Sequence, residues 1–135
     1  MRGLYVNLPV KDVEASKRFF TALGFSFNAQ FSNEQTACMV VEENIAVLMH
    51  AEPRFHDFIT GGIGDPAQGV EVLNCLTASS REEVDDMLAK ALAAGGKPWK
   101  PNMDYGFMYG CSFRDLDGHV WELAYMDMAA MQAAA

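Results

Sequence analysis

The sequence predicts an α+β protein built from two tandem β-α-β-β-β modules that form a curved mixed sheet around a shared cleft. Three observations support this fold class. A strand pattern followed by an amphipathic helix ending in glycine occurs twice, over residues 3–24 and again over residues 70–96. Each helix is followed by short strand-like segments. The length of 135 residues suits a single domain, 1–135, in which the two repeats cover each other's open sheet faces.

The first module is predicted to cover residues 1–50. Apolar and other side chains alternate over residues 3–10, which is typical of a half-buried strand. Asp12 is placed to cap a helix over residues 12–23, and Gly24 supplies the left-handed stop. Three further strands are expected at residues 25–31, 36–42 and 45–50.

The second module is predicted at residues 69–127, after a connector at 51–68 that is rich in proline and glycine and could also act as a lid. A strand at residues 70–77 precedes a capping box from Ser80 to Glu83, which starts the second helix. Later strands are expected at residues 97–100, 109–114 and 119–125, with a hairpin turn at 115–118. The tail, 128–135, permits a helix but has no apolar stripe, so we expect fraying there.

The composition excludes several function classes. A formal net charge of −8 gives no basic field for nucleic acid or an anionic membrane. No run approaches the roughly 20 apolar residues that span a bilayer, and the amino terminus has no apolar leader pattern, so we expect a cytoplasmic protein. Cys38, Cys75 and Cys111 are isolated in apolar segments, which predicts buried reduced thiols.

The two modules, the opening LPVKDVEASKRFFTALGF and the closing FRDLDGHVWEL together resemble the vicinal oxygen chelate superfamily over residues 2–127. That superfamily includes lactoylglutathione lyase (glyoxalase I), extradiol dioxygenases, and bleomycin and fosfomycin resistance proteins. YGFMYGCSFRDLDGHVWELAYMD looks like its branch of predicted lactoylglutathione lyases. The resemblance implies a small oxygenated substrate and a divalent metal (Ni, Zn, Mn or Fe), held by His and Glu on the first and last strands of each module.

Carried over residue by residue, the resemblance implies a reduced ligand set. Tyr5 lies where the first His is expected, and Asn7 lies on the same strand face, so both are predicted to bind substrate. The second ligand position falls near Val47. Glu71 takes the third position and Glu122 matches the final carboxylate. Glu122 is therefore the predicted catalytic residue, and Glu122 with Glu71 the predicted metal ligands.

An aromatic segment, residues 102–109, is the other predicted part of the site. Tyr105, Phe107 and Tyr109 flank a glycine there and could wrap a ligand. The alternative is a hairpin loop that packs on itself. The histidines are weaker candidates for the site. His119 is expected to cap the hairpin turn, and His50 and His56 are expected to stay outside the pocket.

Three functions remain open from the sequence. The first is a metal-dependent lyase or isomerase of lactoylglutathione lyase type. The second is a non-catalytic protein of bleomycin-resistance type that binds or sequesters an apolar or aromatic small molecule. The third is a structural or regulatory dimer. A homodimer is expected, with modules paired within or between chains.

Overall fold

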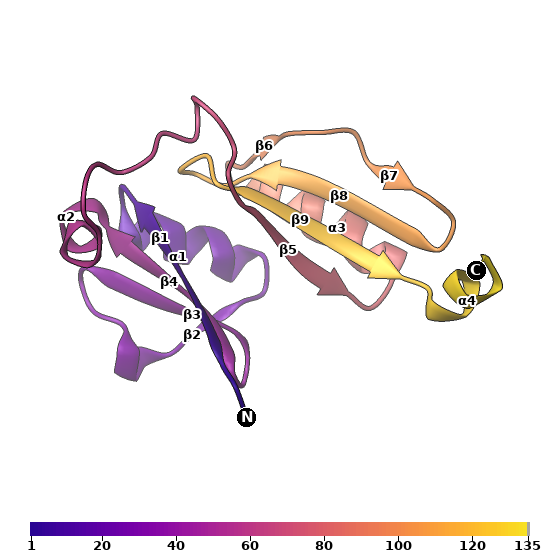
Figure 1. Ribbon diagram of the computed structural model, residues 1–135, viewed down its shortest axis with the longest axis horizontal. Helices are drawn as coiled ribbons and strands as arrows, with labels where there is room; N and C mark the ends of the chain where they lie inside the picture. Colours follow the sequence, from indigo (N-terminus) through magenta and orange to yellow (C-terminus); the bar gives the residue numbers. More distant parts are fainter. Residues whose placement is uncertain (135) are drawn as a thin grey trace. The chain divides into compact units, whose positions relative to one another are not determined.

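The computed structural model describes residues 1–134 and confirms the α+β class, with one mixed sheet and one long helix in each of two compact units. The units comprise residues 1–65 and residues 66 onward. Figure 1 shows α1 along one face of the first sheet and α3 along one face of the second. Ala135, the last residue of the predicted tail, lies outside the described residues. No helix within residues 1–134 is long and apolar enough to span a membrane.

The first unit has a four-stranded sheet in the order β1-β4-β3-β2. β1 runs parallel to β4, and the other neighbours are antiparallel. Its elements are β1 (Leu4–Val10), α1 (Val13–Ala22), β2 (Ser26–Phe27), the 3₁₀ helix η1 (Ala29–Phe31), β3 (Thr36–Glu42), β4 (Ile45–Ala51), α2 (Glu52–Phe55) and the 3₁₀ helix η2 (His56–Phe58).

Local signals set the bounds of α1 as predicted. The Asp12 carboxylate accepts a hydrogen bond from the Ala15 N–H at 3.0 Å, and Gly24 has a φ of +106° that favours glycine. Phe19 and Phe20 are buried on the sheet side of this helix, with ring centroids 4.9 Å apart. Burial of this apolar stripe holds α1 against β3 and β4.

The predicted strand at residues 25–31 is wrong in its second half. β2 ends at Phe27, because the Asn28 side chain accepts the N–H groups of Gln30 at 2.9 Å and Phe31 at 3.4 Å. A short side chain that bonds its own backbone competes with strand pairing. The chain therefore turns into η1.

The second unit has a sheet in the order β5-β9-β8-β6, with β7 also paired to β8. β5 runs parallel to β9, and the other pairs are antiparallel. Its elements are β5 (Leu73–Ala78), α3 (Arg81–Ala93), β6 (Lys97–Pro98), β7 (Met103–Asp104), β8 (Met108–Arg114), β9 (Val120–Met126) and α4 (Met128–Ala134).

The start of α3 differs in one detail from the predicted capping box. The Ser80 hydroxyl accepts the Glu83 N–H at 3.0 Å, as expected. The Glu83 carboxylate, however, accepts the N–H of Ser79 at 3.1 Å and the Ser79 hydroxyl. In a capping box, Glu83 would accept the N–H of Ser80. Here it accepts the N–H of Ser79, one residue earlier, and so satisfies a donor beside the first turn of the helix.

The turn before β9 is organised by a buried carboxylate. Asp115 is 6% exposed and accepts from the N–H groups of Asp117 at 2.9 Å and His119 at 3.0 Å. It also accepts from Trp121 Nε1 at 2.9 Å. Burial raises the pKa of the Asp115 carboxyl. This turn anchors Trp121 inside the unit, which directs Glu122 to the opposite face of the strand.

The prediction of three buried thiols is correct for Cys38 and Cys111 but wrong for Cys75, which is exposed. Cys111 faces α3, where its Sγ lies 3.9 Å from the Val84 carbonyl oxygen. Cys75 lies on the face of β5 that α3 does not cover, because its ladder partner is Glu122.

Candidate functional site

Each sheet has a face that its long helix does not cover, and the candidate site residues of the first unit lie on that face. Asn7 of β1 pairs in register with Leu48 of β4. Because parallel partners point to the same side, the helix-free face carries Tyr5, Asn7 and His50. Val47 has the opposite parity and is buried at 4% exposure.

A hydrogen-bonded chain crosses this face. His50 Nε2 lies 2.8 Å from Asn7 Oδ1, and His50 Nδ1 lies 2.8 Å from Thr36 Oγ1. The imidazole is 4% exposed and lies 4.9 Å from the Phe58 ring. Burial, and next the nearby Arg54 guanidinium, lower the pKa of His50. The ring is therefore neutral at physiological pH.

Sequence reasoning missed His50. Its place outside the pocket stays a prediction, but its Nε2 directly contacts Asn7, a predicted substrate-binding residue. The signal in the sequence is the three-residue step from Val47, which puts His50 on the other strand face. The sequence does not indicate the parallel register of β1 and β4, which brings His50 beside Asn7.

In the second unit, Glu122 lies on the helix-free face between two neighbours. It pairs in register with Cys75 of β5 and Ser112 of β8. Glu122 is half-buried, and no side chain within residues 66–134 forms a hydrogen bond or ion pair with its carboxylate. Burial, and then the Glu122 charge, raise the pKa of the Cys75 thiol, so Cys75 is a weak nucleophile. Glu122 is thus a carboxylate available to a ligand or a proton.

Glu71 lies two residues before β5, which starts at Leu73 rather than at residue 70, and its side chain is exposed. Within residues 1–134 no three His, Cys, Asp or Glu side chains gather as a metal site requires. The first unit offers Tyr5 and Asn7 at its ligand positions, and both nitrogens of His50 are already hydrogen-bonded. These donors do not fit a metal centre within either unit. The metal role of Glu71 and Glu122 stays a prediction.

The predicted ligand segment, residues 102–109, is a hairpin. β7 pairs with β8, and the Tyr105 N–H donates to the Met108 carbonyl at 2.9 Å. Tyr105 is 60% exposed, and its ring stacks on Phe107 with centroids 6.4 Å apart. The hairpin thus presents a pair of aromatic rings at its end, and their ligand-binding role stays a prediction.

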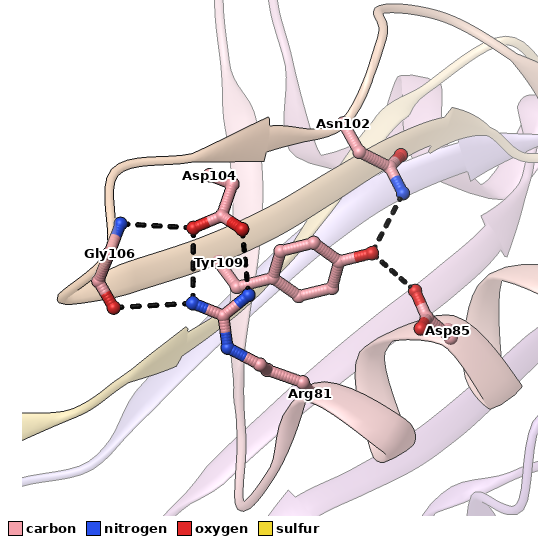
Figure 2. Close-up of polar contacts among 6 residues, drawn as sticks. All are labelled: Arg81, Asp85, Asn102, Asp104, Gly106 and Tyr109. Atoms are coloured by element: carbon pink, nitrogen blue, oxygen red, sulfur yellow. Dashed lines mark hydrogen bonds and ion pairs between the residues drawn. The ribbon is translucent and has the colours of Figure 1, made fainter.

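This hairpin is fixed to the first turn of α3 by Arg81 (Figure 2). The guanidinium donates to both Asp104 carboxylate oxygens, at 2.8 and 3.0 Å, and to the Gly106 carbonyl at 3.2 Å. Arg81 holds the pKa of the Asp104 carboxyl down at about 2. The same guanidinium lies 4.9 Å above the Tyr109 ring, whose hydroxyl donates to Asp85 at 2.5 Å.

These contacts divide the predicted site residues. Tyr109 points to α3, whereas Glu122 lies on the opposite face of the same sheet. Tyr5 and Asn7 share one face in the first unit, and Tyr105 stacks on Phe107 in the second. Arg81, which the sequence did not single out, connects the aromatic hairpin to the helix.

Comparisons with known proteins agree with this architecture. Residues 2–42 match the family model described as bleomycin resistance protein-like N-terminal. The fold is similar to a hypothetical protein from S. aureus, with 26% identity, a TM-score of 0.79 and coverage of 93% of this chain and 94% of that one. It is also similar to a glyoxalase-related enzyme from Fulvimarina pelagi, with 19% identity, a TM-score of 0.77 and coverage of 93% and 88%. A glyoxalase/bleomycin resistance protein/dioxygenase family enzyme from Burkholderia phytofirmans matches at 17% identity and a TM-score of 0.75, with coverage of 90% and 96%. No curated protein matches the sequence.

The chain therefore has the fold of the glyoxalase/bleomycin resistance/dioxygenase proteins. The family model matches residues 2–42, which lie within the first module.

Proposed function

We propose that this protein binds a small molecule on the helix-free face of its first sheet without using a metal. The observation that carries the proposal is the Asn7–His50–Thr36 chain, with distances of 2.8 Å on both sides of the imidazole. Both imidazole nitrogens of His50 are hydrogen-bonded, one to Asn7 and the other to Thr36. His50 therefore holds the Asn7 amide in place and has no free nitrogen to bind a metal.

The surroundings favour a ligand with an apolar or aromatic body and a polar edge. Tyr5 is 68% exposed on the same strand face as Asn7, which provides a ring beside an amide. The Tyr105–Phe107 stack at the β7–β8 hairpin is a separate aromatic surface of the second unit. Aromatic walls with a few placed polar groups are typical of small-molecule sites. The homodimer and the cytoplasmic location stay predictions.

A fragment screen by NMR tests this function. Aromatic fragments with a polar substituent should shift backbone signals of β1 and β4. Tyr5→Ala and Asn7→Ala should each weaken binding by about tenfold, because each loses roughly 1.4 kcal/mol of contact. Lys17→Ala on α1 is the control, since within residues 1–134 its ion pair is the 3.9 Å contact with Glu14. Unchanged affinity in both test variants would contradict the proposal.

A second candidate is a lyase or isomerase of lactoylglutathione lyase type, for which Glu122 is the supporting observation. A half-buried carboxylate without a partner in its own unit is available as a general base. It would take the proton from the carbon that bears the hydroxyl and return it to the adjacent carbonyl carbon, while the hydroxyl proton passes to the former carbonyl oxygen.

The assay for this candidate is isomerisation of the hemithioacetal of methylglyoxal and glutathione. Glu122→Gln should abolish the rate, whereas Glu82→Gln, the same change at an exposed position of α3, should not. An inactive native protein, or an active Glu122→Gln variant, would rule this candidate out.

A further inference from the structure

His50 is a buried imidazole with a single polar partner at each nitrogen. Nδ1 faces Thr36 Oγ1 and Nε2 faces Asn7 Oδ1, both at 2.8 Å. At 4% exposure, the His50 side chain itself meets little solvent. In a neutral imidazole one nitrogen donates and the other accepts, so the two neighbours together decide which tautomer is present.

Asn7 settles the question. Its Nδ2 donates to the Tyr5 carbonyl oxygen at 3.3 Å, which leaves Oδ1 as the atom that faces His50. A reversed amide would place Oδ1 against that carbonyl, so that two acceptors would face each other. With the amide in this orientation its oxygen accepts, and His50 Nε2 carries the hydrogen.

The rest of the chain follows from this assignment. Nδ1 of His50 is then an acceptor, and the Thr36 hydroxyl donates to it. Three hydrogen bonds run in one direction, from Thr36 through His50 to Asn7 and on to the Tyr5 carbonyl. The lowered pKa of His50 agrees with a neutral ring in this position.

We propose that His50, as the Nε2–H tautomer, is a positioning residue that holds the Asn7 amide so that its NH₂ group is the donor presented to a ligand. The inference rests on the proposed binding function and names the ligand class. One Asn7 N–H bonds the Tyr5 carbonyl, and the second has no partner within residues 1–65. Asn7 is exposed, so a ligand at this strand meets a donor and must supply a carbonyl or carboxylate oxygen.

The first experiment is imidazole NMR of isotope-labelled protein at neutral pH. His50 should show a protonated Nε2 and an unprotonated Nδ1. Asn7→Leu removes the acceptor and should move the population toward the Nδ1–H form, which can donate to Thr36. His56→Gln, a change at an exposed histidine, should leave the His50 signals unchanged. An imidazolium or an Nδ1–H ring in the native protein would overturn the inference.

The second experiment uses acetophenone, which carries an accepting oxygen, and ethylbenzene, which does not. Acetophenone should shift the Asn7 side-chain NH₂ signal, and ethylbenzene should leave it in place. His50→Leu should weaken acetophenone binding by up to about tenfold, the worth of one hydrogen bond. His50→Gln should restore it, because a glutamine amide can still donate to Asn7.

The outcomes separate the inference from the function it rests on. Acetophenone binding that shifts β1 and β4 but not the Asn7 NH₂, or that survives His50→Leu, overturns the positioning role and leaves small-molecule binding intact. Failure of both probes and of the whole fragment screen rejects the binding function itself. The tautomer measurement is independent of any ligand and decides the orientation of the amide in either case.

Discussion

Replacing Asp115 by asparagine should destabilise the second unit by about 1–3 kcal/mol. The native carboxylate satisfies two backbone N–H groups with one oxygen and Trp121 Nε1 with the other. Asparagine has one accepting oxygen and one NH₂ group. The NH₂ group must therefore face either the backbone N–H groups or the indole N–H of Trp121, which are all donors. If the oxygen stays with the backbone, the indole N–H of a side chain that is 1% exposed loses its acceptor.

The structure also bounds the size of this effect. Leaving a buried donor unsatisfied costs about 1–3 kcal/mol. Burial raises the pKa of Asp115, which means that the ionised group itself bears a desolvation cost. Neutral asparagine avoids this cost, so the loss should fall in the lower half of that range.

Urea unfolding followed by far-ultraviolet circular dichroism and Trp99 fluorescence measures the change, because Trp99 lies in the second unit and remains in every variant. In a Trp121→Phe background there is no indole N–H, and Asp115→Asn should then cost less than about 1 kcal/mol. Asp86→Asn is the matched control and should stay within about 0.5 kcal/mol, since its carboxylate is 64% exposed. The reasoning is refuted if Asp115→Asn is as stable as the native protein, or costs the same with and without Trp121.

Further predictions concern the hairpin and the metal. Arg81→Ala should speed hydrogen exchange of the amides of residues 103–106 several-fold, because it removes the contact with Asp104. The control is Lys90→Ala, which breaks the 2.9 Å pair with Asp86 on the same helix and should leave this exchange unchanged. Equal exchange in both variants would contradict the role of Arg81. Arg81 lowers the pKa of Asp104 to about 2. The protection that the Arg81–Asp104 pair gives the hairpin is therefore fully present above the unfolded pKa of about 4, and it is lost as the pH falls toward about 2. The native chain and Asp104→Asn should therefore differ in exchange at neutral pH and converge in acid; a difference that persists below about pH 2 would refute the assignment. Elemental analysis after incubation with Ni, Zn, Mn or Fe should find no stoichiometric metal, since no three donors gather within residues 1–134; one metal per chain that is lost in Glu122→Ala would overturn this and support the catalytic candidate.

The sequence predicted features that depend on neighbours along the chain. The cap at Asp12, the positive φ of Gly24 and the bounds of the strand at Thr36–Glu42 all agree with the structure. So does the turn at Asp115, although the sequence did not indicate that its carboxylate would be buried. Caps, turns and alternation are short-range effects, so the residues within a few positions determine them.

The functional side chains depended on contacts between residues distant in the sequence. Asn7 and His50 meet across 43 positions because β1 and β4 pair in parallel, and nothing local fixes that register. Arg81 reaches Asp104 across 23 positions and joins the hairpin of residues 102–109 to α3, a contact that no local pattern indicates. Local patterns were enough to predict two β-α-β-β-β modules and to place Glu122 on a strand. The side chains around these elements depend on strand register and on hydrogen bonds between elements, which form when the sheets and helices pack.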